Sequence, residues 1–365
     1  MLNVLRVGSG RVTCGRGVAA DIGREVRLSG SSRAFIIGGP RALSVSLSHI
    51  RPALEKEEIK CAVHEFTGYC SRRQISAIVQ EAREFGAEII IGTGGGRSID
   101  TSKAVAASIA RPVITIPTSA ATCAAWAPLS IVYTDDGKPD GSIQHLQEQS
   151  ALILDFELIA TCPARLMAAG IADAVAKYPE LRNGFVGPSA EKTDPFLTSA
   201  IELSRAVSDM LFRIGIQAYR DSQEGALSTA MEEAAIANIC LTGVVSGLSC
   251  GSKQLAFAHT LHDVLHQHFH DSIHGLYHGE IVSLGILTQM ILNDSAEKDI
   301  NKMAQFLRPL HLPTSLADIG LDLTEENAET ILGSMEHFGN VTYDNGARRR
   351  IVDALKQTIA WEVKA

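Results

Sequence analysis

The sequence lacks the excess of basic residues that a nucleic-acid-binding surface needs. Its 365 residues include 33 Lys and Arg against 41 Asp and Glu, which gives a formal net charge of −8 at pH 7. Surfaces that hold nucleic acid or anionic lipid require clustered positive charge. The balance therefore argues against nucleic acid and membrane as partners, leaves only a local basic pocket open, and favours a small-molecule ligand.

Targeting and membrane-spanning segments are also missing. The first residues show no basic stretch followed by a long apolar run, so no signal peptide is predicted. The most apolar stretch, from Ile281 to Ile291, is interrupted by Ser, Gly, Thr and Gln and is too short to cross a bilayer. The sequence thus predicts a cytoplasmic protein.

Paired cysteines are absent as well. None of the seven cysteines forms a C-x-x-C pair, and an odd, scattered set indicates reduced thiols in a reducing compartment. Most are expected to be small buried side chains. They stand at positions 14, 61, 70, 123, 162, 240 and 250.

The first 150 residues contain alternating strand and helix signals. The length favours two or three domains, and 45% hydrophobic with 20% charged residues is ordinary for a globular protein. A capping box at 71–74, a 3.6-residue apolar period and Gly86 predict one helix between two strands. Such alternation implies a parallel sheet covered on both faces. The predicted strands cover 33–39, 60–68, 88–91, 113–117 and 130–134.

From about Cys162 the composition changes to Ala, Leu, Met and Glu, and β-branched runs become rare. This half is expected to be helical, and Asp194 followed by Pro195 is a helix start signal. The expected fold is an α/β domain over residues 1–160 and an all-α domain over residues 161–365. The predicted helices cover 164–177, 195–218, 223–246, 254–270, 281–292 and 298–307.

Three consecutive glycines, 94–96, follow an apolar strand and precede a helix. They remove every Cβ from the turn, so the backbone can approach a pyrophosphate and the N–H groups of the helix point at it. Arg97 can add a charged contact, and Asp100 lies on one helical face with Lys103. The spacing is neither G-x-G-x-x-G nor a P-loop. A turn used only for packing is the alternative, but the strand–turn–helix context favours a dinucleotide site.

Seven of the twelve histidines fall between His259 and His278, mostly three or four residues apart. Clustered histidine with carboxylate is the ligand set that a borderline-soft divalent metal prefers. A catalytic metal keeps one position open, so one carboxylate and two imidazoles are expected, with Asp173 as the remote carboxylate candidate. Spacing alone does not identify the histidines, because several pairs qualify: 262/266, 266/270, 270/274 and 274/278.

Five stretches, taken together and in order, carry a family resemblance: 91–103, 117–134, 163–173, 258–262 and 277–280. Over nearly its whole length the chain resembles the glycerol dehydrogenase-like branch of the iron-containing alcohol dehydrogenase superfamily. The Thr-Cys-Ala-Ala-Trp run at 122–126 is similar to that of the hydroxycarboxylate dehydrogenase relatives. The resemblance implies an α/β nucleotide-binding domain, a helical domain, and a site in the cleft between them.

The resemblance also implies residue roles. Asp173, His259 and His278 would be the catalytic metal ligands. The iron enzymes have a further histidine four residues after the aspartate, and this position is Lys177 here, which favours Zn²⁺ over Fe²⁺. The dinucleotide would lie against Gly95, Gly96, Arg97, Thr118, Leu129 and Tyr133.

Some positions depart from the family pattern. The acidic residue that binds the adenosine ribose is replaced by Gly39, with Arg41 nearby, which favours NADP(H) among the NAD(P) cofactors. The substrate-hydroxyl aspartate is replaced by Cys123, an uncharged thiol that makes an anionic 2-hydroxy or 2-oxo acid acceptable. Trp126 is either a substrate contact or a packing residue. Pro179 is expected to kink or restart the metal-binding helix.

The expected activity is metal-dependent hydride transfer between NAD(P) and a small alcohol or 2-hydroxy acid, with His262 or water relaying the proton. One alternative is a dehydroquinate synthase-like lyase or cyclase, which needs several basic residues for a phosphorylated substrate. The helical half offers mainly Lys177, Arg182 and Lys253 for that purpose. The other alternative is a non-catalytic binding homologue, against which the intact ligand set argues. The resemblance further suggests a homo-oligomer.

Overall fold

The computed structural model of the protein describes residues 7–182, 195–249, 257–339 and 342–361. Three features singled out in the sequence lie outside these residues, namely the helix start signal at Asp194, the cysteine at 250 and the basic residue Lys253. The six cysteines within them are all unpaired thiols, as the sequence predicts.

The N-terminal half is built on a six-stranded parallel sheet, as predicted. Strands such as β4 and β5 are buried at every residue, because helices cover both faces. The strand order is β1-β8-β5-β4-β2-β3. The strands are β1 (Val12–Gly15), β2 (Arg33–Gly38), β3 (Lys60–Glu65), β4 (Ile89–Gly94), β5 (Val113–Pro117) and β8 (Ala151–Asp155).

The strand predicted at 130–134 forms, but it lies outside this sheet. It is β6 (Leu129–Tyr133), which pairs antiparallel with β7 (Pro139–Gln144) in a separate hairpin. Buried and more exposed residues alternate along β6, a pattern typical of an antiparallel strand with one face uncovered.

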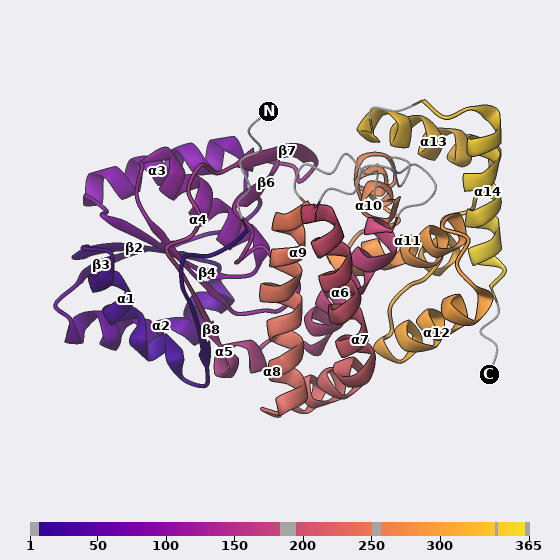
Figure 1. The fold of residues 1–365 in the computed structure, drawn as a ribbon. Coiled ribbons are helices and arrows are strands. Elements are labelled where there is room, and N and C mark those ends of the chain that lie inside the picture. Colours follow the sequence, from indigo (N-terminus) through magenta and orange to yellow (C-terminus); the bar gives the residue numbers. More distant parts are fainter. Residues whose placement is uncertain (1–6, 183–194, 250–256, 340–341, 362–365) are drawn as a thin grey trace.

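Four helices cover the two faces of the sheet (Figure 1). α1 (Ile22–Leu28) and α2 (Pro40–Lys56) pack on one face, and α3 (Arg72–Phe85) and α4 (Gly96–Ser108) on the other. Ser71 caps α3 by accepting from the N–H of Gln74 at 3.2 Å, and Gly86 ends it in the left-handed region. From β2 the chain crosses to β3 at one edge of the sheet, whereas from β4 it crosses in the opposite direction along the sheet to β5. Adjacent β2 and β4 therefore flank the point where crossover direction reverses, which is where open α/β sheets bind ligands.

The C-terminal half is helical, as predicted (Figure 1). Its short helical segments include a π-helical turn at Ala237–Leu241 and 3₁₀ turns at Arg308–Leu310 and Leu316–Ile319. The predicted helix at 223–246 is divided, because the preceding helix runs on to Glu224 and a new one starts after the cap at Ser228. The helices are α5 (Phe156–Ala160), α6 (Ala164–Leu181), α7 (Pro195–Glu224), α8 (Thr229–Ile236), α9 (Thr242–Ser249), α10 (Phe257–His268), α11 (His278–Leu292), α12 (Glu297–Leu307), α13 (Glu325–Gly339) and α14 (Asn345–Ile359).

Of the two expectations for Pro179, a kink or a restart of the helix, the structure contradicts the restart. α6 continues through Pro179 and ends two residues later at Leu181. Its end is held from α11, where the side-chain amide of Asn293 donates to the Pro179 carbonyl at 2.6 Å. Tertiary contacts thus outweigh the lost backbone donor, which is one hydrogen bond in the last turn. As a consequence, Glu180 remains on α6.

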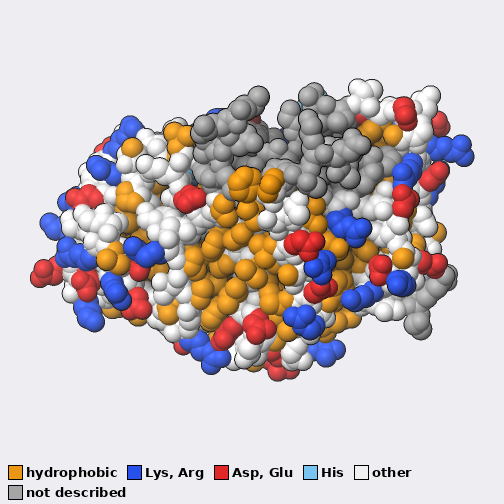
Figure 2. All heavy atoms as spheres, in the orientation of Figure 1, with side chains coloured by type: hydrophobic (Ala, Val, Ile, Leu, Met, Phe, Trp, Pro, Cys, Tyr) orange, Lys and Arg blue, Asp and Glu red, His pale blue; other side chains and the backbone are white. Residues whose placement is uncertain are grey.

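One helical stretch corrects the expectation that no segment is long enough to cross a membrane. Thr229–Ser249 spans 21 residues with a mean hydropathy of 1.2, which meets the length and composition of a membrane span. In the most apolar part of this stretch, 61% is buried inside the protein, as in the core helix of a globular protein. Ile281–Ile291 lies within α11, which is shorter. Figure 2 shows hydrophobic side chains gathered on the face over α8 and α9. Assembly into a homo-oligomer remains a prediction.

Candidate active site

Three side chains from three helices form a candidate metal site. Asp173 lies in the middle of α6, His259 in the first turn of α10, and His278 is the first residue of α11. One ligand atom from each lies within 4.8 Å of the others, and no other such group occurs in the described ranges. His259 Nε2 is 3.2 Å and His278 Nε2 3.9 Å from Asp173 Oδ1. The structure thus brings His259 and His278 to Asp173, a combination that is not among the i, i+4 pairs that spacing left open.

Close backbone approaches bring these helices together. A Cβ on Gly279, next to His278, would lie 1.8 Å from the carbonyl oxygen of Ala169 in α6. A Cβ on Gly170 would lie 1.8 Å from the carbonyl oxygen of Ala120, which precedes Cys123 by three residues. Only glycine permits contacts this short. The two glycines therefore set how near α11 and the 120–126 segment come to Asp173.

Each histidine is oriented by a second side chain. Glu180, which the sequence analysis missed, accepts from His259 Nδ1 at 2.7 Å and from the His259 backbone N–H at 2.9 Å. On His278, Nδ1 lies 3.0 Å from His262 Nε2, and His262 Nδ1 lies 2.9 Å from Asp263. With protons on the Nδ1 atoms, both metal-site histidines present Nε2 to Asp173. Such outer partners fix ring orientation in metal sites. The sequence analysis expected His262 at the substrate, and it lies behind His278.

Lys177 completes one face of α6. Asp173, Lys177 and Glu180 stand at i, i+4 and i+7, so all three project to the same side. The Lys177 ammonium lies 2.8 Å from His259 Nε2 and 3.3 Å from Asp173 Oδ1. Lys177 and Glu180 follow Asp173 by four and seven residues, and this helical spacing was the sequence signal that could have placed Glu180 at the site.

The charges of this cluster shift its pKa values. Burial alone raises the pKa of Asp173, but Lys177 and the two histidines outweigh it and hold this pKa well below its ordinary value. Burial, with His262 nearby, lowers the pKa of His278 well below that of free histidine. Burial also opposes a charge on His259, but the carboxylates of Glu180 and Asp173 raise its pKa to about 9. An ionised carboxylate and a neutral His278 are the forms that a metal ion requires, whereas His259, with its raised pKa, must release a proton from Nε2 when a metal binds.

The predicted nucleotide residues gather at the carboxyl ends of adjacent strands. Gly39 follows β2, the glycine turn follows β4, and Thr118 follows β5. A Cβ on Gly94 would lie 2.3 Å from Ser98 Oγ, so the turn has no room for a side chain there. Gly95 caps α4 without any side-chain hydrogen bond. The first N–H groups of α4 are therefore open to an anionic ligand.

Other predicted nucleotide residues surround this edge. Arg97 is exposed and its guanidinium lies 5.2 Å from the ring centre of Tyr69, which in turn packs 5.7 Å from Tyr133. Arg41 donates to the Thr161 carbonyl at 3.1 Å. Leu129 begins β6 and is half-buried.

Asp100 has an internal role that its sequence position did not reveal. It is buried, pairs with Lys103 at 2.8 Å and accepts from the N–H of Ile131 at 3.2 Å. Lys103 also donates to the carbonyls of Ala124 and Ala127 at 2.7 and 2.9 Å, and to that of Leu129. The pair thus fastens the 124–129 segment to α4, and its carboxylate points into the domain.

The predicted substrate residues differ in their surroundings. Cys123 Sγ lies 3.7 Å from Ser246 Oγ of α9, and its pKa is raised by burial and by the charge of Asp173. Trp126 donates from its indole to the Val7 carbonyl at 2.7 Å and packs on Gly243 of α9. These contacts are those of the packing alternative for Trp126.

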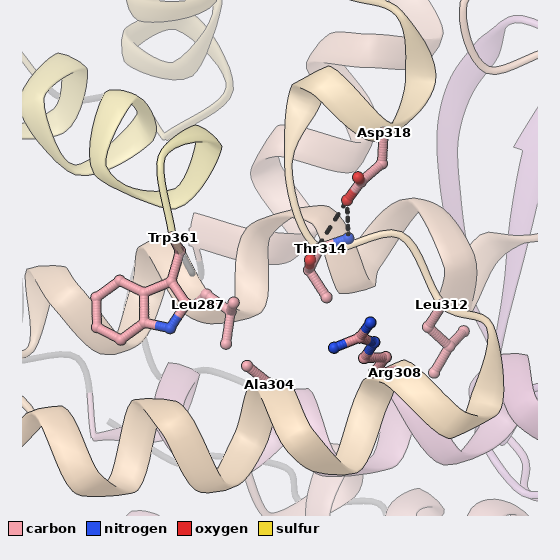
Figure 3. A pocket seen from close by; sticks show the side chains of 7 residues that line it. All are labelled: Leu287, Ala304, Arg308, Leu312, Thr314, Asp318 and Trp361. Atoms are coloured by element: carbon pink, nitrogen blue, oxygen red, sulfur yellow. Dashed lines mark hydrogen bonds between the residues drawn. The ribbon is translucent and has the colours of Figure 1, made fainter. Parts of the chain in front are cut away.

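A separate pocket of about 360 Å³ lies elsewhere in the helical half (Figure 3). Arg308 points into it, while Asp318 accepts from the backbone N–H of Thr314 at 2.7 Å. It contains none of the predicted site residues. Its lining residues are Leu287, Ala304, Arg308, Leu312, Thr314, Asp318 and Trp361.

Comparison with known proteins identifies the family and agrees with the fold. Residues 9–155 match the family described as iron-containing alcohol dehydrogenase. The chain is 30% identical over 291 residues to glycerol dehydrogenase of Citrobacter freundii, covering 79% of this chain and 77% of the relative. The chain belongs to the iron-containing alcohol dehydrogenase family. Hydroxycarboxylate dehydrogenase A of Escherichia coli K12 is also 30% identical, over 81% of this chain and 79% of the relative.

The structures of this family share the two-part fold. The crystal structure of glycerol dehydrogenase from Schizosaccharomyces pombe superposes with a TM-score of 0.85 at 24% identity, covering 98% of this chain and 91% of that one. The expected fold class, a parallel α/β domain followed by a helical domain, is therefore confirmed. The division at residues 160 and 161 remains a prediction. Within the iron-containing alcohol dehydrogenase family the chain is an oxidoreductase of the glycerol dehydrogenase-like branch.

Proposed function

We propose that the protein is a metal-dependent dehydrogenase that transfers a hydride between NAD(P) and a small alcohol or 2-hydroxy acid. The observation that carries this proposal is the convergence of one carboxylate and two oriented imidazoles from three helices. Family membership and the uncapped glycine turn before α4 support the cofactor half. Asp173, His259 and His278 would hold the cation and leave one position for substrate.

In this mechanism the residues of the protein bind the reactants and orient the metal ligands. When bound, a divalent cation supplies Lewis-acid polarisation of the substrate oxygen, and the nicotinamide supplies the hydride chemistry. Glu180 holds the proton of His259 on Nδ1, and His262 does the same for His278. The N-terminus of α4 binds the dinucleotide phosphates. The 120–126 segment, which contains Cys123, forms one side of the proposed substrate site.

The donor set favours Zn²⁺ over Fe²⁺ as the cation. Three ligands of nitrogen and oxygen suit catalytic zinc, and the position of the iron enzymes' extra histidine holds Lys177. For the cofactor, NADP(H) is favoured because Gly39 places no carboxylate after β2. The exposed Arg41 stands two residues further on at the start of α2.

The first test is spectrophotometric. Zinc-loaded protein is mixed with NADPH or NADH and with pyruvate, hydroxyacetone, dihydroxyacetone or simple aldehydes, and loss of the reduced nicotinamide absorbance is followed. We expect net oxidation of the cofactor that a chelator abolishes. Asp173→Ala should lose both zinc and turnover, whereas the matched control His270→Ala, an exposed histidine of the same region, should keep both. Full activity of zinc-free Asp173→Ala would overturn the proposal.

A further inference from the structure

Lys177 is unusual in the candidate site, because its side chain places a positive charge among the residues proposed as metal ligands. Its ammonium contacts His259 Nε2 at 2.8 Å and Asp173 Oδ1 at 3.3 Å. These are two of the three ligand atoms that the proposed metal ion needs. A bound cation therefore takes away both partners that Lys177 has in the structure.

Within the described parts of the chain, no other carboxylate contacts Lys177 to replace them. Both oxygens of Glu180, the next acidic residue along α6, already face His259 Nδ1, at 2.7 and 2.9 Å. Cys123 is also close enough to Lys177 to interact with its charge, and burial raises the pKa of the Cys123 thiol, which keeps it neutral. An ammonium held in such surroundings is costly unless an anion pairs with it.

The exposure of the pair shows from where that anion can come. The side chain of Lys177 is 19% exposed, whereas that of Asp173 is 4% exposed. The side chains of His259 and His278 are also partly exposed, at 24% and 33%, so Lys177 lies with them at the accessible part of the site, whereas Asp173 is its buried member. A ligand at the open metal position is therefore close to the Lys177 ammonium, which contacts two of the three proposed ligand residues.

We propose that Lys177 binds the carboxylate of the substrate, so that the natural substrates are 2-hydroxy or 2-oxo acids. This inference rests on the proposed function and specifies its substrate class. In such acids the carboxylate is attached to the carbon that carries the reacting oxygen. One molecule can thus place that oxygen at the open metal position and its carboxylate on Lys177. Lys177 is a specificity-determining residue in this arrangement, and Cys123 contributes by adding no opposing charge.

Lys177→Met is compared with Lys177→Arg and with Lys298→Met, an exposed lysine of α12 that serves as the charge-loss control. The first readout needs no turnover: oxamate, a 2-oxo acid analogue, is titrated calorimetrically into zinc-loaded protein with reduced cofactor. We expect oxamate affinity to fall about 100-fold in Lys177→Met, to be largely restored in Lys177→Arg, and to stay unchanged in Lys298→Met. Unchanged oxamate affinity in Lys177→Met would overturn the inference.

The second readout compares pyruvate with hydroxyacetone, in which an uncharged CH₂OH group replaces the carboxylate. In Lys177→Met, kcat/KM for pyruvate should fall mainly through KM and far more than kcat/KM for hydroxyacetone. Parallel losses for both substrates would contradict a role in carboxylate binding.

Zinc affinity is measured by competition with a chelator. It should rise in Lys177→Met, because a cation competing for the same two atoms is removed. A fall in zinc affinity would identify Lys177 as a support of the metal ligands and sink the inference. Wild-type protein that oxidises no reduced cofactor with any substrate would instead refute the proposed function, and the oxamate titration tells the two failures apart.

Discussion

In the part of the chain that the structure describes, two aspartate–lysine pairs have a buried aspartate, one in each half, and their surroundings differ. Asp100 and Lys103 lie one turn apart in α4 of the sheet-containing half, and Asp173 and Lys177 lie one turn apart in α6 of the helical half. The Lys103 ammonium has three backbone carbonyls as partners besides Asp100. Among the described residues, the Lys177 ammonium contacts two partners, and both are side chains suited to bind a metal.

The same contrast appears in the two carboxylates. Burial raises the pKa of Asp100, and Lys103 opposes this only in part. The pKa of Asp173 is lowered despite equal burial, because two histidines act together with Lys177. A saturated pair held by backbone groups is therefore part of the fold. A pair with few partners among chelating side chains is available for function.

The largest effect that separates the two pairs is expected from Lys103→Met. This change leaves Asp100 and three carbonyls buried without their cation, and breaking a buried ion pair in this way costs about 3–5 kcal/mol of unfolding free energy. Lys177→Met should cost much less, because Asp173 keeps His259 as a partner and the lysine is partly exposed. Urea unfolding of the metal-free variants measures both. Equal losses would show that the pairs do not differ in kind.

Glu180→Gln sharpens the comparison, because the pair in α6 has a third charged neighbour. Loss of the carboxylate that orients His259 should weaken zinc binding about 10–100-fold, the range for outer-shell partners of metal ligands. Chelator competition provides the measurement. The matched control is Glu25→Gln, a buried carboxylate paired with Arg11 far from the site. Similar weakening in both variants would mean that Glu180 acts through general stability.

The smallest effect concerns acid stability of the metal-free protein. Because the pKa of Asp173 is lowered on folding, its charge stabilises the protein above the ordinary value near 3.9, and this contribution is lost as pH falls. For Asp100 the sign is opposite, because its raised pKa favours the native state at low pH. Asp173→Asn should therefore flatten the fall of the thermal midpoint between about pH 5 and 3, whereas Asp100→Asn should steepen it. Identical slopes in the two variants would contradict the contrast between the pairs.

The segment proposed to bind the nucleotide could be predicted because its sequence pattern is local. A buried strand, three glycines and a helix start stand in one continuous segment, and the structure reproduces them as β4, Gly94–Gly96 and α4. The pairing of strands was harder to predict from the sequence. The run at 130–134 has a strand pattern, but nothing within it shows that it lies outside the main sheet. That depends on its partner β7, which the sequence analysis did not identify.

The metal side could be predicted only in part. Residue types and crowding pointed to a metal, whereas the choice among histidine pairs depends on how α6, α10 and α11 meet. That meeting rests on contacts such as Gly279 against Ala169, which no local pattern encodes. Glu180 was missed because Pro179 was expected to interrupt α6, and the packing that carries the helix past the proline comes from α11.

The contacts of Lys103 have a consequence for the spacing of the two reactants. α4 begins at the glycine loop proposed to hold the cofactor phosphates. Two helical turns later, Lys103 donates hydrogen bonds to the segment that follows Cys123. A single helix thus connects the proposed phosphate-binding turn with the segment that follows Cys123. Each residue inserted or deleted between Arg97 and Ser102 would rotate one end against the other by about 100°. The number of residues in this helix, as well as their identity, is therefore part of the proposed catalytic apparatus.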